Sequence, residues 1–251
     1  MNTSLQWYNH FKNNLTIQRV DWNLKPEINA TERANILQSL QAWQLGETSE
    51  GTHLMRAAHK YSKRIGDSDY PAAVELFIKE EQKHGNNLGK YLGLIGEPRI
   101  EKNWGDTLFR KIRYFNTSME LWTLAVITVE STAQIFYQSL KDATNCALLK
   151  QICTDILIDE AKHIDFQLER LQIINAQKNP ISKFFEYYFY VIFYFSTISV
   201  VWLAHKKVFK AGGLTFTKYF RKIKFKFDKT ILKTKTTHAY NLSGSVHNIG
   251  F

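Results

Sequence analysis

Apolar residues recur every three or four positions along four segments between residues 29 and 179, which is the spacing of one face of an α-helix. Alternating patterns typical of strands are nearly absent there. The first segment opens with Asn29 and Glu32, spaced as in a capping box. The apolar stripes include Ile36, Leu40 and Leu54 in the first segment, Val74, Phe77 and Leu88 in the second, Trp122, Val126 and Ala133 in the third, and Ile152, Ile156 and Leu171 in the fourth. The pattern predicts an all-α fold.

Breaks in the pattern show how the four predicted helices connect. The sequence GDSDYP at 66–71 separates the first two, with Pro71 suited to a first helical turn. Residues 93–106 carry Gly, Pro and Trp without a helical stripe and are long enough to cross a bundle. Asn179 and Pro180 end the fourth helix. Two helix pairs joined by a long crossover predict a four-helix bundle over residues 29–179, after an N-terminal extension at 1–28.

Carboxylates and imidazoles interrupt all four apolar stripes. The inward positions are Glu47 and Glu50 in the first helix, Glu81 and His84 in the second, Glu130 in the third, and Glu160 and His163 in the fourth. A Glu-x-x-His pair lies one turn apart on one helix face, so its two side chains can hold one metal ion. Burying these groups without a cation would be costly, which favours a metal site over a buried polar network.

The two halves of the predicted bundle resemble each other. SEGT at 49–52 is similar to VEST at 129–132, and EEQKH at 80–84 is similar to DEAKH at 159–163. The interval from residue 50 to residue 81 is 31, and that from 130 to 160 is 30. The polar residues therefore lie at matching heights in the two halves.

With these motifs, residues 29–178 resemble the ferritin-like di-iron carboxylate proteins, a superfamily that includes oxygenases and rubrerythrins. The resemblance implies a ferritin-like four-helix bundle holding two Fe ions, or Mn, with dioxygen as oxidant. The implied ligands are Glu50, Glu81, His84, Glu130, Glu160 and His163, with Glu81 and Glu160 bridging. It also implies that Glu80 and Asp159 orient the ligand histidines.

Several assignments stay open. Glu50 is preferred to Glu47 as the first ligand because EGT matches EST. His53 lies either beside the metals or at the surface. Tyr91 and Tyr137, each seven residues beyond a proposed ligand, are either redox-active or core aromatics.

Charge and composition change the picture mainly at the C-terminal end. The chain of 251 residues carries a net charge of +10, and Asp228 is the lone acid between residues 205 and 235. Such a basic segment attracts a membrane surface, an acyl carrier protein or tRNA. The first 30 residues lack the apolar core of a signal peptide, and Cys146 and Cys153 form no CxxC motif. A cytoplasmic location is expected.

The sequence pattern of residues 180–233 predicts two further helices. The run at 184–204 has Glu186 as its only charge, so it either packs on the bundle or at a homodimer interface, or enters a membrane. The next segment places Phe220, Ile223, Phe227 and Ile231 at helical spacing among lysines, typical of a helix that rests on an anionic membrane or has one solvated face. Membrane association would then run through residues 184–231, and residues 234–251 are expected to be a disordered tail.

The leading functional hypothesis is a di-iron oxidoreductase that activates dioxygen to oxidise or hydroxylate an organic substrate, hydrophobic or polar, with an external electron donor. The resemblance leaves open a ferroxidase or a peroxide-reducing protein of the same fold. A hypothesis of another class is a membrane-associated helical scaffold without enzymatic activity.

Overall fold

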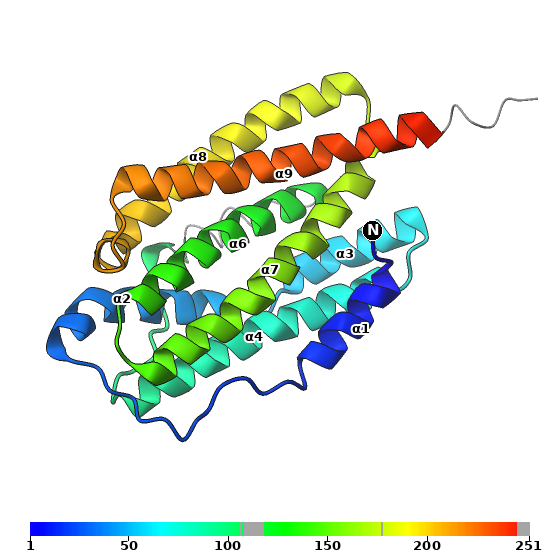
Figure 1. Cartoon of the computed structure of the whole chain (residues 1–251). Helices are drawn as coiled ribbons and strands as arrows, with labels where there is room; N and C mark the ends of the chain where they lie inside the picture. Colours follow the sequence, from blue (N-terminus) through cyan, green and yellow to red (C-terminus); the bar gives the residue numbers. More distant parts are fainter. Residues whose placement is uncertain (106, 108–117, 177, 245–251) are drawn as a thin grey trace, which may run out of the picture.

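A computed structural model shows the arrangement of the chain (Figure 1) and describes residues 1–251 except 106, 108–117, 177 and 245–251. The described residues form helices and no strand, which confirms the predicted all-α class. The helices are α1 (Ser4–Asn14), α2 (Ala30–Glu47), α3 (Thr52–Ile65), α4 (Tyr70–Leu94), α6 (Met119–Asp142), α7 (Ala147–Ala176), α8 (Pro180–Ala211) and α9 (Phe216–Gly244).

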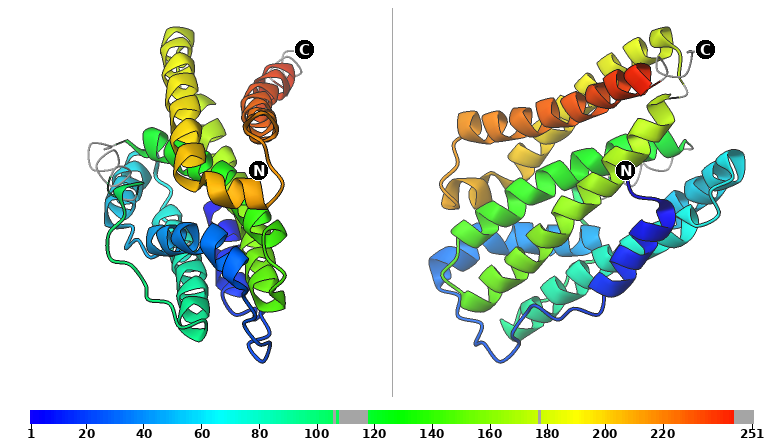
Figure 2. Two further views of the ribbon diagram at one scale, coloured as in Figure 1. Left: turned by 90° about the vertical axis from the view of Figure 1, so that its left-hand side faces the viewer. Right: turned by 45° about the vertical axis from the view of Figure 1, so that its right-hand side comes forward.

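The bundle consists of α4, α6, α7 and a first helix that is split into α2 and α3 (Figure 2). Helices α4 and α6 both begin in the hydrophobic cluster that contains Phe77 and end in the cluster that contains Leu88. Helices α2–α3 and α7 pass between the two clusters in the opposite direction. Because α4 and α6 therefore run in the same direction, their connection must span the length of the bundle. The predicted four-helix bundle with a long crossover and added C-terminal helices is confirmed.

A polar layer separates two hydrophobic clusters inside the bundle. One cluster contains Leu40, Leu88 and Ile152, and the other contains Ala57, Phe77 and Phe166. Between them lie the buried carboxylates and imidazoles of all four bundle helices. Close packing on both sides fixes the height of the polar side chains along the helices.

The predicted first helix is wrong in one respect, because it does not continue past Glu47. The chain breaks at residues 48–51, and Gly51 adopts a left-handed conformation with φ of +65° before α3 begins. A Cβ at this position would lie 2.5 Å from Cδ1 of Ile78. Both the backbone conformation and the lack of space therefore require glycine. The inward stripe therefore ends at Glu47, which is buried, and Glu50 lies in the break and is exposed.

The N-terminal extension is part of the packed structure. Helix α1 starts with a capping box at Thr3 and lies along α4. Its Trp7 and Phe11 are buried against Phe166 of α7, and the indole Nε1 of Trp7 donates a hydrogen bond to Glu169 at 2.7 Å. The extension thereby brings Asn14, the last residue of α1, into the protein interior.

Helices α8 and α9 form an added layer against α6, α7 and α2. The buried residues of α8 begin only at Tyr190, although α8 itself begins at Pro180. Helix α9 is amphipathic as predicted, but Ile223 and Phe227 of its apolar stripe are buried in the protein core, so these side chains are not free to contact a membrane. Helix α9 continues to Gly244, and residues 245–251 of the expected disordered tail lie outside the described residues.

Candidate metal centre

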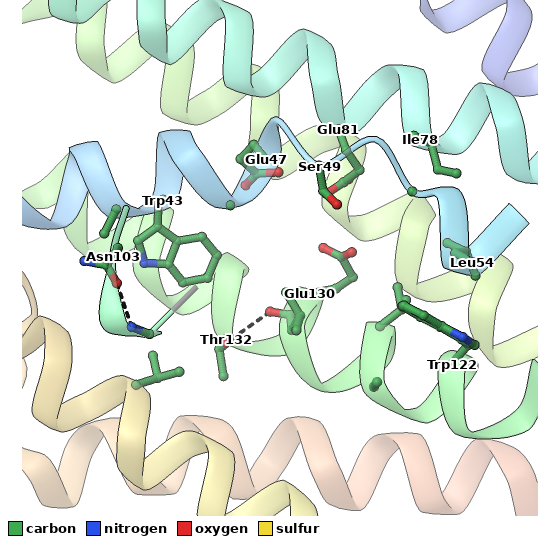
Figure 3. A pocket seen from close by; sticks show the side chains of 18 of the residues that line it. Trp43, Glu47, Ser49, Leu54, Ile78, Glu81, Asn103, Trp122, Glu130 and Thr132 are labelled. Carbon is green, nitrogen blue, oxygen red and sulfur yellow. Dashed lines mark hydrogen bonds between the residues drawn. The ribbon is translucent and has the colours of Figure 1, made fainter. Parts of the chain in front are cut away.

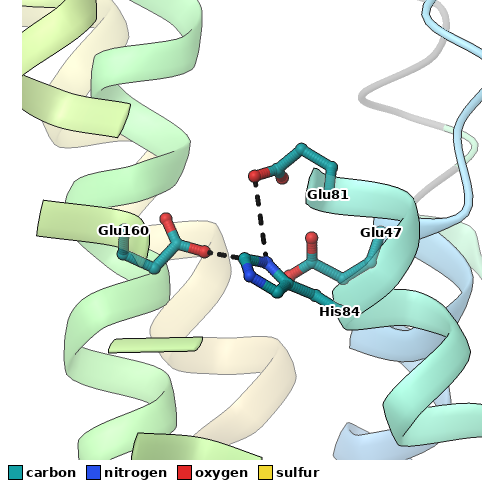
Figure 4. A group of neighbouring side chains, drawn as sticks. All are labelled: Glu47, Glu81, His84 and Glu160. Carbon is teal, nitrogen blue, oxygen red and sulfur yellow. Dashed lines mark ion pairs between the residues drawn. The ribbon is translucent and has the colours of Figure 1, made fainter. Parts of the chain in front are cut away.

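Two groups of metal-ligating side chains lie next to each other in the polar layer. The first group is Glu47, Glu81, His84 and Glu160 (Figure 4), and the second is Glu81, Glu130, Glu160 and His163. Within each group one ligand atom per residue lies within 4.8 Å of all the others. Because Glu81 and Glu160 belong to both groups, the geometry is that of two neighbouring cation sites sharing two carboxylates.

Six donor atoms of this cluster are buried and make no hydrogen bond of regular geometry among the described residues, although Nδ1 of His163 and Oε1 of Glu81 form an ion pair at 2.8 Å. They are Nδ1 of His84, Nδ1 of His163, Oε1 of Glu81, Oε2 of Glu130, and both carboxylate oxygens of Glu160. Orphaned buried polar atoms are rare in folded proteins, and carboxylate and imidazole donors suit first-row transition metals. The residues present therefore fit a pair of metal ions.

The other nitrogen of each imidazole is held by an acid from the opposite helix. His84 of α4 makes a 3.1 Å hydrogen bond through Nε2 with Asp159 of α7, and His163 of α7 makes a 2.9 Å bond through Nε2 with Glu80 of α4. Such contacts fix the orientation and tautomer of a ligand histidine and leave Nδ1 toward the cluster. Each orienting acid thus comes from the helix across the site, not from the helix of its histidine.

The N-terminal segment joins these two acids. The side-chain amide of Asn14 donates to Oε1 of Glu80 at 2.6 Å and to Oδ1 of Asp159 at 2.8 Å. Arg19 donates to Asp155 at 2.6 Å and to Asp159 at 2.9 Å. Sequence periodicity could not reveal Asn14 or Arg19, because they approach α7 from more than a hundred residues away in the chain.

Electrostatics show that the cluster favours added positive charge. Burial raises the pKa of Glu47 and Glu130 well above the usual range, and the charges of Glu81 and Glu160 raise both further. Burial opposes protonation of His163, but the neighbouring charge of Glu81 and hydrogen bonds to acids outweigh it and raise the His163 pKa. The cluster therefore holds protons more strongly than isolated side chains do, and divalent cations would compete with protons for the same positions.

The structure brings five of the six preferred ligand residues into one cluster, and the sixth member of the cluster is Glu47 instead of Glu50. Glu50 is exposed in the break between α2 and α3, whereas the Glu47 carboxylate accepts a 2.5 Å hydrogen bond from the Tyr137 hydroxyl. His53 is exposed at the start of α3. Tyr91 is buried away from the cluster, and burial followed by a contact with Cys146 raises its pKa.

A cavity of about 410 Å³ opens onto the carboxylates (Figure 3). The Glu47, Glu81 and Glu130 carboxylates point toward it, while most of its remaining lining is apolar or aromatic. The apolar lining includes Trp43, Leu54, Phe77, Trp122, Val126, Phe193 and Val201. A cavity of this size can hold a small organic molecule beside the candidate metal ions.

His205 lines the same cavity at a local departure of α8 from helical geometry, with φ of −119° and ψ of 18°. Its Nδ1 lies 3.0 Å from Oγ of Ser39, and its ring packs against Trp43 and Phe136. Burial lowers the pKa of His205 from 6.5 to about 4. The imidazole is therefore neutral at pH 7 and adds no charge to the cavity.

The lowered pKa of His205 predicts a loss of stability in mild acid. Between pH 6.5 and 4 the unfolded chain binds a proton at this residue and the folded chain does not, so stability falls as the pH falls through this window. We expect His205 to account for a loss of about 2 kcal/mol in unfolding free energy between pH 7 and pH 5. Urea unfolding of the wild type and of His205→Gln at both pH values measures this loss of unfolding free energy. An equal loss in the two proteins would contradict the prediction.

Comparison of the fold with solved structures finds R2-like ligand-binding oxidase. One variant with an aerobically reconstituted Mn/Fe cofactor matches with a TM-score of 0.62 and 17% identity over 92% of this chain and 94% of that chain. Another aerobically reconstituted variant matches with a TM-score of 0.61 and 18% identity over 93% of both chains. An anaerobically reconstituted variant matches with a TM-score of 0.60 and 17% identity over 93% of both chains.

The amino-acid sequence itself matches no protein-family model and no curated protein. At 17–18% identity the structural likeness establishes the fold and leaves the reaction to be argued from the site. The site contributes a cluster of four glutamates and two histidines in the bundle core, all of them buried except the partly exposed Glu81. The chain therefore has the predicted ferritin-like fold, shared with the R2-like ligand-binding oxidases, and carries a carboxylate and histidine cluster that could hold two metal ions.

Proposed function

We propose that this protein is a di-metal oxidoreductase that uses dioxygen to oxidise or hydroxylate an apolar organic molecule. The observation that carries the proposal is the cavity of about 410 Å³, whose largely apolar wall ends on the Glu47, Glu81 and Glu130 carboxylates. The R2-like ligand-binding oxidases supply an analogy at the level of the fold. Storage or detoxification of iron needs no such cavity, so this feature favours an organic substrate over a ferroxidase.

The donor set favours Fe or Mn as the bound metals. Four carboxylates and two imidazoles without a thiolate suit these ions, and the Mn/Fe cofactor of the structural neighbours supports the same choice. When bound, the ions would supply electrons to dioxygen. Glu47, Glu81, His84, Glu130, Glu160 and His163 would hold them, with Glu81 and Glu160 placed to serve both.

The protein residues around the cluster have separate tasks in this proposal. Asp159 and Glu80 orient the two histidines, and the Tyr137 hydroxyl holds the Glu47 carboxylate in place. The aromatic and aliphatic wall excludes water and takes up the apolar part of the substrate. Hydroxylation would place one oxygen atom on the substrate and release the other as water, with two electrons from an external donor and two protons.

Gly46 offers a variant that separates substrate binding from metal binding. It lies inside α2 and lines the cavity, and a Cβ at this position would meet no atom within 4 Å. We expect Gly46→Leu to bind metal like the wild type and to lose at least about 90% of substrate oxidation, because the new side chain fills space that a ligand would occupy. A Gly93→Leu variant is a matched control, since Gly93 also has free space but lies at the end of α4.

The test incubates the reduced, metal-loaded protein with a lipid extract in air and in ¹⁸O₂, and follows products by mass spectrometry. An organic product that gains labelled oxygen or loses two hydrogens supports the proposal. Oxidation of added Fe(II) at the same rate in Gly46→Leu and wild type, without any organic product, would instead establish a ferroxidase.

A further inference from the structure

The first third of α8 presents an apolar face that no other described helix covers. None of residues 180–189 is buried, and the exposed apolar side chains recur at helical spacing. This α8 aromatic stripe consists of Ile181, Phe184, Phe185, Tyr188, Phe189 and Ile192, with exposed fractions from 52% to 71%. A stripe of this kind on a soluble surface marks an interaction site.

Helix α9 presents a basic outward face around one exposed aromatic residue. This α9 basic stripe consists of Lys218, Arg221, Lys222, Phe225 and Lys229, all exposed. Phe225 is 69% exposed, although the other apolar positions of α9 at Ile223 and Phe227 are buried. Asp228 is the only acid nearby in sequence, and it pairs with Lys224 at 2.6 Å. The positive charge of this face is therefore not neutralised within α9.

Both stripes belong to the same layer of the molecule. Helices α8 and α9 lie side by side on the side of the bundle away from α1 and α4, as the views in Figures 1 and 2 agree. Their contacts with the rest of the protein are to α6, α7 and α2 on the bundle side. Because the residues of both stripes are exposed, neither stripe is covered by the bundle, and both are available to a partner of this layer.

We propose that the α8–α9 layer docks on an anionic phospholipid membrane, with the α8 aromatic stripe inserted at the level of the headgroups and the α9 basic stripe against the lipid phosphates. Aromatic side chains favour the membrane interface, and lysines and arginines near an anionic bilayer are attracted to it. An amphipathic, basic and aromatic surface is the form that peripheral membrane attachment takes.

The geometry points to attachment in the interface and not to a membrane span. By length and composition α8 could cross a membrane, and only a third of its most apolar window is buried, but that third is held by the protein. The Tyr194 and Tyr219 hydroxyls donate hydrogen bonds that link α8 to α9, and Ile198 is 1% exposed. The ten residues before Tyr190 span about 15 Å, half of the roughly 30 Å bilayer core.

Other occupants fit the surface less well. A twofold dimer through this layer would bring each α9 basic stripe toward positive charge of the second copy, and dimer interface cores are depleted of charge. Nucleic acid would neutralise the lysines and arginines but would leave Ile181, Phe185 and Ile192 exposed to water. The inference rests on the surface alone and does not depend on the proposed oxidoreductase function.

The test is co-sedimentation of the full-length protein with vesicles of phosphatidylcholine, alone or with one third phosphatidylglycerol. We expect binding to the anionic vesicles only, weakened by 0.5 M salt. Phe184→Ser/Phe185→Ser and Lys222→Glu/Lys229→Glu should each lower partitioning at least about tenfold. The matched controls are Leu94→Ser/Ile158→Ser, with both residues 47% exposed, and Lys60→Glu/Lys63→Glu on α3. They should bind as the wild type does.

Four results would overturn the proposal. The wild type could stay in the supernatant with anionic vesicles, or the controls could lose as much binding as the stripe variants. A dimer in solution that Phe184→Ser/Phe185→Ser dissociates would assign the surface to a second copy of the chain. Bound protein that resists extraction by alkaline carbonate would contradict attachment in the interface. Circular dichroism of every variant shows whether the fold is retained.

Discussion

The double substitution Glu81→Ala/Glu160→Ala is expected to abolish the binding of both metal ions. Anaerobic titration of the wild-type apoprotein with Fe(II) should reach two ions per chain, because the cluster forms two groups of ligands. Each substituted residue belongs to both groups, so neither group keeps a complete set of donors. We expect affinity to fall by at least about 100-fold, the upper end of the loss caused by removing an outer hydrogen-bond partner.

Thermal unfolding gives an independent measure of the same binding. A ligand that binds only the folded state stabilises it by about 2.7 kcal/mol at 100 times its dissociation constant. Fe(II) should therefore raise the unfolding temperature of the wild type and leave that of the double variant unchanged. Glu75→Ala on α4 is the control, because Glu75 is 55% exposed and pairs only with Lys79 within the described contacts. Folded wild-type protein that takes up no metal would contradict the metal centre.

The bundle and most of the cluster could be predicted because both follow helix periodicity. Within α4 the residues Glu81 and His84 share a face by spacing alone, and Glu160 and His163 do so within α7. The repeat between the two halves of the chain then places these pairs at the same height. Since α4, α6 and α7 are uninterrupted through the polar layer, a straight helical stripe describes them correctly.

The first helix could not be predicted in the same way, because its end depends on tertiary contacts. A 4,3,4,3 spacing continues through residues 47, 50 and 54, but the backbone leaves the helix after Glu47. Gly85 of α4 leaves no room for a Cβ, which would lie 3.1 Å from the Glu47 carbonyl carbon. This close approach of α4 to the end of α2 fixes where α2 stops. The sequence of α2 alone gives no information about this contact.

The surroundings of the cluster were equally hidden from sequence patterns. Asn14 bridges Glu80 and Asp159 from the end of α1, and nothing in the local sequence of α1 indicates a partner 145 residues away. The cavity is likewise assembled from side chains of α2, α3, α4, α6 and α8. Local periodicity predicts which face of a helix is inward, whereas the packing of the helices decides what that face meets.

The choice between Glu47 and Glu50 predicts a second large effect. Glu47→Ala should weaken binding of the ion near His84 by at least about 10-fold, because Glu47 belongs to the ligand group that contains His84. Glu50→Ala should bind both ions as the wild type does, since Glu50 is exposed in the break after α2. Fe(II) titration of the two single variants, each compared with the wild type, measures the difference directly.

Glu47→Gln sharpens this comparison, because it keeps an oxygen to accept the hydrogen bond from Tyr137 and removes only the negative charge. We expect it to lose affinity nearly as Glu47→Ala does, since a neutral amide is a poor metal ligand beside three carboxylates. If Glu50→Ala lost an ion and Glu47→Ala did not, the chain between α2 and α3 would have to rearrange on metal binding. The SEGT and VEST repeat would then mark the ligands, as the sequence pattern predicts.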